Sequence, residues 1–194
     1  MKMETHLDEV VFQAIARRWE DRAKDIAFLA KHFWHSFEEW LNWEALLGCR
    51  DAGLHNVWPK APYSHKDQDR SLPKVIRFKD TKEISDIMVD SDSERVVVEV
   101  SVVHGTDGKN RARLDHDRMK LNPEGCQAAD KKVFPLLLVV SMYHAENPQN
   151  ASFPRWFTEW VAKSESEMGP AFKHTFKLDE CGLFEARGWC VSHR

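Results

Sequence analysis

The centre of the predicted fold is the run Ile84-Ser-Asp-Ile-Met-Val-Asp90, followed by Arg95-Val-Val-Val-Glu-Val-Ser-Val-Val103. Both runs are rich in apolar and β-branched residues, and the turn-forming cluster Asp90-Ser-Asp-Ser-Glu94 separates them. This pattern predicts a β-hairpin. Each run carries a carboxylate, Asp86 in the first and Glu99 in the second, and a carboxylate among valines is costly to bury unless it is paired or binds a metal.

Pairing of the two strands would bring Asp86 and Glu99 together at one end of the hairpin. Alternation along the second strand places Val98 and its even-numbered neighbours on one face and Glu99 with Ser101 on the other. Two acidic side chains at one end of a hairpin suit a hard cation such as Mg²⁺, which takes one or two carboxylates plus water and phosphate oxygens. The alternative is that Glu99 faces solvent and Asp86 is an ordinary strand-entry residue.

Composition limits the kind of protein further. The 194 residues are 42% hydrophobic, which suffices for one well-packed domain but not for two. The net charge of −3 excludes a uniformly basic nucleic-acid-binding protein, but not a nuclease with a local basic surface. The four Cys are scattered, which fits neither a zinc site nor a disulfide framework. Without a signal peptide or a run of ~20 apolar residues, we expect a soluble cytoplasmic protein that does not associate with membranes.

Hydrophobic periodicity predicts helix over about 7–47, broken near 32–36 into two helices. Ser36 is the expected N-cap of the second helix, and Gly48 is its expected stop. The other predicted elements are an edge strand or extended ribbon at 54–63, a short strand at 74–79, a helix at 109–121, a buried strand at 133–141, a helix at 153–163 and a terminal hairpin at 172–178 and 183–189. Together they predict an α/β fold: a three-layer-type sandwich with a mixed central β-sheet flanked by helices and preceded by N-terminal helices.

The order of these elements resembles the core of the PD-(D/E)XK, or restriction-endonuclease-like, nuclease superfamily. A Glu-bearing helix, Asp86 opening one strand, Glu99 within the next, a polar helix and an apolar strand carry the likeness, which covers about 40–142. The resemblance implies that Asp86 and Glu99 hold the catalytic metal. It also implies a further ligand from the first core helix, for which Glu44 is our candidate and Glu38 and Glu39 are rivals.

Length, composition and the order of the elements predict a domain organisation. All of 1–194 would form a single domain, in which an N-terminal helical region at about 7–47 leads into the nuclease-like core at about 40–142. A C-terminal helix and hairpin at about 153–194 would complete it.

Two positions depart from the pattern of the superfamily. Its lysine, two residues after the second acid, is replaced by Ser101, and Ser85 stands where a proline precedes the first acid. In the superfamily this lysine helps to orient the attacking water and offsets developing charge. Either Lys109 or Lys120 of the following helix replaces it, or the fold is kept for binding and catalysis is lost. We favour Lys120, because a helix packed antiparallel on the strand returns its C-terminal half toward the acids.

The helix at 109–121 also has more basic than acidic residues, and Arg111, Arg113 and Arg118 are candidates for binding nucleic acid. The alternative is a solvated amphipathic helix with internal ion pairs. The resemblance implies a Mg²⁺- or Mn²⁺-dependent endonuclease acting on DNA in preference to RNA, of restriction, mobile-element or phage-defence type. The rival hypothesis is a non-catalytic interaction or inhibitor protein on the same fold. The eight Trp leave room for one or two at the surface of a homodimer or another protein partner.

Overall fold

The computed structural model describes residues 6–32, 34–60, 85–103, 108–121, 131–144, 155–178 and 182–191. The strand predicted at 74–79 lies outside these residues. The elements follow one another as α1 (Leu7–Asp21), α2 (Ala23–His32), α3 (Trp34–Asp51), β1 (Asn56–Pro59), β2 (Ile87–Asp90), β3 (Glu94–Val103), α4 (Gly108–Lys120), β4 (Lys132–His144), α5 (Arg155–Met168), β5 (Phe172–Lys177) and β6 (Gly182–Cys190).

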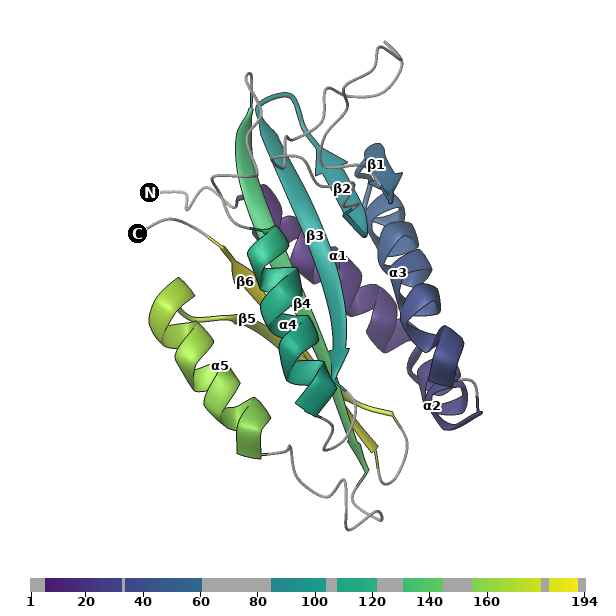
Figure 1. Ribbon diagram of the computed structural model, residues 1–194. Coiled ribbons are helices and arrows are strands. Elements are labelled where there is room, and N and C mark those ends of the chain that lie inside the picture. Colours follow the sequence, from purple (N-terminus) through teal and green to yellow (C-terminus); the bar gives the residue numbers. More distant parts are fainter. Residues whose placement is uncertain are drawn as a thin grey trace.

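The strands form one six-stranded sheet in the order β1-β2-β3-β4-β6-β5. β3 and β4 are parallel, and all the other neighbours are antiparallel. Helices α1, α2 and α3 lie on one side of the sheet, and α4 and α5 lie on the other (Figure 1). The predicted α/β fold with a mixed central sheet is therefore confirmed.

The central strand β3 is buried on both faces, and its alternate residues belong to two different cores. Val98 and its even-numbered neighbours pack in the core that includes α1 and α3. Val97 and Val103 pack in the core that includes α4 and α5. Because side chains alternate along a strand, Glu99 and Ser101 share the second face. The predicted division of the strand is confirmed.

β2 and β3 form the predicted hairpin. The backbone N–H of Asp86 donates a hydrogen bond to the carbonyl oxygen of Val98 at 3.1 Å, just beyond the last paired residues of β2. Continuing this antiparallel register by one residue places Asp86 opposite Glu99, and directly opposed residues share a face of the sheet. The Asp86 side chain is fixed as well, because its Oδ2 accepts a hydrogen bond from the backbone N–H of Val100 at 2.8 Å.

The N-terminal region contains three described helices rather than the two that were predicted. The break expected near 32–36 is present, but Ser36 lies inside α3, so its predicted capping role is wrong. The additional break is at Arg22, whose N–H bonds to the carbonyl oxygen of Trp19 at 3.1 Å. An i→i−3 bond of this kind tightens the last turn of a helix.

Gly48 does not end α3, as the sequence pattern suggested, because the helix continues to Asp51. A Cβ on Gly48 would lie 2.6 Å from the Cβ of Arg18 and 2.9 Å from the carbonyl oxygen of Ala14. Glycine at this position therefore lets α1 and α3 approach closely. The helix ends instead beside Gly53, which has a φ of 84°, the left-handed conformation that is common after a helix C-terminus.

The connection from β3 to β4 orients α4. Because these two strands are parallel, the helix between them runs back along the sheet. Leu114 of α4 and Leu121, just after it, pack in the core on the α4 and α5 side of the sheet. The indole N–H of Trp160 in α5 donates a hydrogen bond to Asp115 of α4 at 2.9 Å. The C-terminal end of α4 thereby comes to lie over β3. No helix in the described part of the chain has the length and apolar character needed to cross a membrane.

Candidate functional site

Three of the residues predicted for the site lie together on the α4 side of the hairpin. The Nζ of Lys120 is 3.2 Å from Oε2 of Glu99. Asp86 lies opposite Glu99 in the sheet register. Burial raises the pKa of Asp86 to about 6, while the hydrogen bond from Val100 and the nearby charge of Lys120 act in the opposite direction. Residues from β3, from α4 and from the start of β2 thus meet at one place.

Glu99 is the most buried member of this group, with a side chain that is 3% exposed. Burial raises the pKa of Glu99 to about 8, although the ion pair with Lys120 favours the charged form. Its Oε1 is buried and has no hydrogen-bond partner in the structure. Since a buried polar atom without a partner costs free energy, this oxygen is available as a ligand for a cation.

Lys120 is the lysine that α4 brings to the acids. Burial lowers the pKa of Lys120, but its pairing with Glu99 and with Asp117 outweighs this effect and raises the pKa, so the ammonium group stays charged. Lys109 lies at the other end of α4, roughly 16 Å away along the helix axis at 1.5 Å per residue. The side chain of Lys109 is outside the part that can be described. Of the two candidate lysines, the geometry favours Lys120.

Asp117 joins the site without having been predicted. Its Oδ1 is 2.9 Å from the Nζ of Lys120, and its Oδ2 accepts a hydrogen bond from the hydroxyl of Ser101. The spacing in the sequence could have indicated this, because Asp117 and Lys120 are three residues apart and therefore share a face of the helix. Ser101, which stands where the resemblance leads us to expect lysine, therefore contacts the site indirectly.

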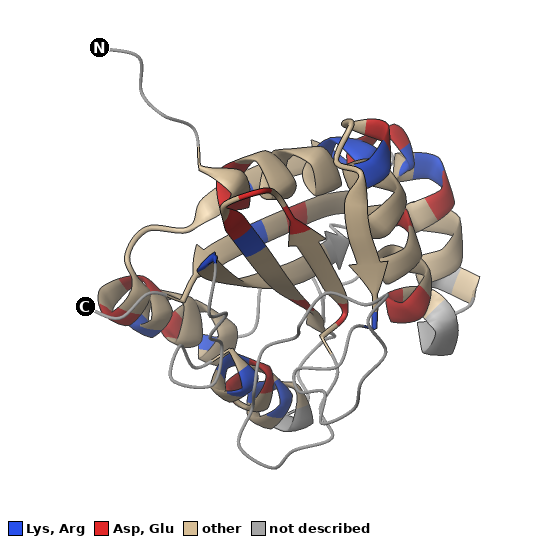
Figure 2. Ribbon diagram, turned by 90° about the horizontal axis from the view of Figure 1, so that it is seen from above, with Lys and Arg blue, Asp and Glu red and all other residues tan. Residues whose placement is uncertain are grey.

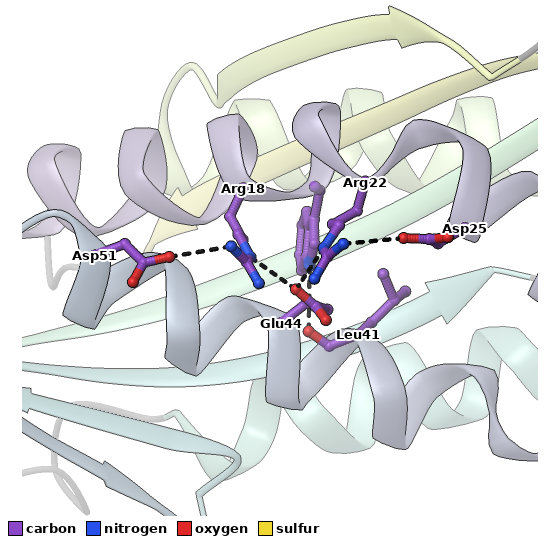
Figure 3. Close-up of polar contacts among 7 residues, drawn as sticks. Arg18, Arg22, Asp25, Leu41, Glu44 and Asp51 are labelled. Carbon is purple, nitrogen blue, oxygen red and sulfur yellow. Dashed lines mark hydrogen bonds and ion pairs between the residues drawn. The ribbon is translucent and has the colours of Figure 1, made fainter.

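Glu44 does not join this group. Its Oε2 accepts a hydrogen bond from the Nε of Arg18 at 2.7 Å and lies 3.5 Å from the Nε of Arg22. Figure 3 shows Glu44 between these two arginines, where α3 meets the preceding helices. The structure therefore does not bring Glu44 to Asp86 and Glu99, because its side chain lies between α3 and the preceding helices.

The rival acids, Glu38 and Glu39, have partners on elements that border the site. Glu39 pairs with Lys60, just after β1, at 2.8 Å. Burial raises the pKa of Asp86, and the negative charge of Glu39 adds to that rise, which indicates that the two carboxylates are near each other. Glu38 pairs with Arg113 of α4. The N-terminal half of α3 therefore borders the site through these two residues.

The three arginines predicted to bind nucleic acid do not form one basic face. Arg113 pairs with Glu38 of α3, and Arg118 pairs with Glu167 of α5. Arg111 is exposed. Figure 2 shows acidic and basic residues interspersed on the helices of this layer. The helix α4 is thus closer to the amphipathic alternative, with ion pairs that tie it to its neighbours.

The donor groups at the site fit a small, hard cation. Asp86 and Glu99 would supply carboxylate oxygens, and the unpartnered Oε1 of Glu99 would gain a partner. Mg²⁺ commonly binds through one or two carboxylates and completes its shell with water and phosphate oxygens. Within the described ranges, no group of three or more His, Cys, Asp or Glu side chains could hold a metal ion. The candidate is therefore a two-carboxylate site.

No protein-family model matches this chain. No curated protein and no solved structure matches it either. A functional interpretation therefore rests on the geometry and the chemistry of the site itself.

Proposed function

We propose that this protein is a metal-dependent endonuclease that hydrolyses phosphodiester bonds, with DNA preferred over RNA. The observation that carries the proposal is the meeting of Asp86, Glu99 and Lys120 on one face of the sheet. Two carboxylates for a metal and one fixed cation are groups that phosphodiester hydrolysis uses. The order α3, β1, β2, β3, α4, β4 agrees with the order on which the resemblance to the PD-(D/E)XK superfamily rests.

Asp86 and Glu99 would hold a Mg²⁺ or Mn²⁺ ion. When bound, such an ion supplies activation of water and neutralises charge on the phosphate. Asp86 is held by the N–H of Val100, and Glu99 is held by a buried strand, so both carboxylates are oriented in advance. Lys120, which stays protonated, can donate a hydrogen bond to a phosphate oxygen as negative charge develops there.

The position of Lys120 supports catalysis over a purely binding role. The main objection to an enzyme was Ser101 at the place where the superfamily has lysine. Lys120 reaches the same carboxylate from α4, at 3.2 Å. The charge that a lysine at position 101 would supply is therefore present, from another element. A restriction, mobile-element or phage-defence role is the biological setting we propose by analogy.

The test is cleavage of supercoiled plasmid, single-stranded DNA and RNA with Mg²⁺, with Mn²⁺ and with EDTA. The full chain should cleave DNA only with a divalent ion. Asp86→Asn and Glu99→Gln should each abolish cleavage while the fold is retained. Glu44→Gln is the matched control, since it makes the same chemical change at a buried, ion-paired glutamate away from the site. Unreduced cleavage by Glu99→Gln, or cleavage by the wild type in EDTA, would overturn the proposal.

A non-catalytic interaction protein is the second candidate. Exposed aromatic side chains favour it, since Phe28 of α2 is 56% exposed and Trp43 of α3 is 49% exposed. Aromatic residues are enriched in protein interfaces. This candidate predicts neither cleavage nor stabilisation by a divalent ion, so the two proposals give opposite results in the same assays.

A further inference from the structure

A chain of polar contacts links strand β3 to the lysine of α4. The hydroxyl of Ser101 donates to Oδ2 of Asp117, and Oδ1 of Asp117 is 2.9 Å from the Nζ of Lys120. Lys120 then reaches Oε2 of Glu99 at 3.2 Å. Ser101 and Glu99 lie on the same face of the same strand, two residues apart. The contacts therefore form a loop that leaves the strand at one residue and returns to it at the other.

The loop answers a physical requirement of Lys120. A lysine carries its charge at the end of a flexible stem with three rotatable donors, so one contact does not fix its position. Asp117 provides the second anchor, from one turn earlier on the same helix. The Asp117 side chain is only 8% exposed, so its charge is weakly screened by solvent. Its carboxylate oxygens therefore need hydrogen-bond partners within the protein.

Ser101 satisfies the remaining oxygen of Asp117. One carboxylate oxygen faces the ammonium group and the other faces the hydroxyl, so the carboxylate cannot turn without losing a contact. The neighbouring cation is placed less closely, since the Nε of Arg113 is 3.9 Å from Oδ2 of Asp117, and Arg113 also pairs with Glu38. The Ser101 contact is therefore the one that orients Asp117.

We propose that Asp117 is a positioning residue that holds the Lys120 ammonium group at Glu99, and that Ser101 in turn positions Asp117. The inference deepens the proposed nuclease function and rests on it for its catalytic meaning. It also gives Ser101 a role. Ser101 stands where the resemblance leads us to expect lysine, and through Asp117 it helps to position Lys120 on the helix.

The first test measures positioning directly, in the full-length protein without metal. Lysine NH₃⁺ groups held by carboxylates exchange slowly and give ¹⁵N-edited NMR signals, and Lys120→Ala identifies the signal of Lys120. Asp117→Asn should broaden that signal or abolish it, and Ser101→Ala should weaken it. The matched control is Asp115→Asn on the same helix, because Asp115 is exposed and bonds Trp160 instead. An unchanged Lys120 signal in folded Asp117→Asn and Ser101→Ala proteins would overturn the inference.

The second test is a double-mutant cycle on turnover of plasmid DNA with Mg²⁺. Asp117→Asn should lower kcat by up to ~10²-fold, the scale of a small misplacement of a catalytic group. In the Lys120→Ala background it should have no further effect, because Asp117 acts through Lys120. Additive losses would indicate a general structural role and would overturn the inference. A wild type that cleaves nothing would remove the proposed function, whereas the NMR result would still decide whether Asp117 positions Lys120.

Discussion

At the level of single residues, Glu99 and Lys120 depend on each other. A buried carboxylate is tolerated when a cation lies beside it, and removal of one partner leaves the other charge uncompensated. In the protein without metal, Lys120 is that partner of Glu99. A divalent ion at Glu99 and Asp86 would supply the positive charge that Glu99 needs, and Lys120, still held by Asp117, would then donate to a phosphate. In the proposed function, the same lysine would have a structural role before the ion binds and a chemical one afterwards.

Lys120→Ala is expected to reduce turnover by ~10²–10³, the usual effect of removing one preorganised electrostatic contact. Binding of Mn²⁺ should be retained, because both carboxylates remain. Turnover is measured on plasmid DNA, and metal binding is measured by titration calorimetry. Lys163→Ala on α5 serves as the control, since Lys163 is 64% exposed and pairs only weakly with Glu167 at 3.8 Å. Wild-type turnover in Lys120→Ala would mean that another group supplies the charge.

Moving the lysine back to the strand provides a complementary test. Residues 99 and 101 share a face of β3, so a lysine at 101 would extend beside Glu99 into the space that Lys120 leaves. The double variant Ser101→Lys, Lys120→Ala should therefore recover part of the turnover that Lys120→Ala loses. Ser101→Lys alone should give no gain, since it adds a second cation and displaces Asp117. A folded double variant that is no more active than Lys120→Ala would contradict the proposed equivalence of the two positions.

At the level of elements, the contact of α1 with α3 explains why Glu44 is not at the site. The two helices approach closely at Gly48, and Trp19 of α1 donates to the backbone carbonyl of Leu41 in α3 at 3.1 Å. This contact turns Glu44 toward Arg18 and Arg22. In the N-terminal half of the same helix, Glu38 pairs with Arg113 of α4 and Glu39 lies near Asp86.

The close approach at Gly48 predicts a measurable cost of substitution. Gly48→Ala should lower the free energy of unfolding by about 1–3 kcal/mol through overpacking, although alanine is about 1 kcal/mol better than glycine within a helix. The new Cβ would meet the Cβ of Arg18 and a backbone oxygen, which cannot move aside easily. Urea denaturation measures the change. Gly53→Asn is the control variant, because Asn accepts the left-handed conformation of residue 53. A Gly48→Ala protein more stable than the wild type would contradict the close packing of α1 and α3.

At the level of the whole molecule, the features predicted correctly are those encoded by neighbouring residues. The alternation of valines with Glu99 and Ser101 predicted which residues of β3 share a face. The turn residues at 90–94 predicted that β3 pairs with β2. The approach of Lys120 to Glu99 followed from the direction of the helix between parallel strands. Each of these depends on local pattern and on chain connectivity, which a single sequence contains.

The features that could not be predicted depend on residues far apart in the sequence. One helix offers three glutamates as candidate ligands, and only the contact of Glu44 with Arg18 shows which way its side chain points. Arg113 and Arg118 suggested a basic face, but their partners lie on other helices. The sequence alone suggests that Gly48 ends the helix. A glycine that ends a helix and a glycine that allows two helices to pack closely cannot be distinguished from the sequence. Tertiary packing decides each of these cases.

If Asp86 and Glu99 hold a divalent ion, Mn²⁺ should raise the melting temperature of the protein, and a thermal melt measures that rise. At 100 times the dissociation constant, a ligand that binds only the folded state adds about 2.7 kcal/mol, or about 5–10 °C in Tm for a chain of this size. The wild type and Glu44→Gln should both show this rise, and Glu99→Gln and Asp86→Asn should not. No rise in the wild type, or an equal rise in folded Glu99→Gln, would mean that these two carboxylates do not hold the ion.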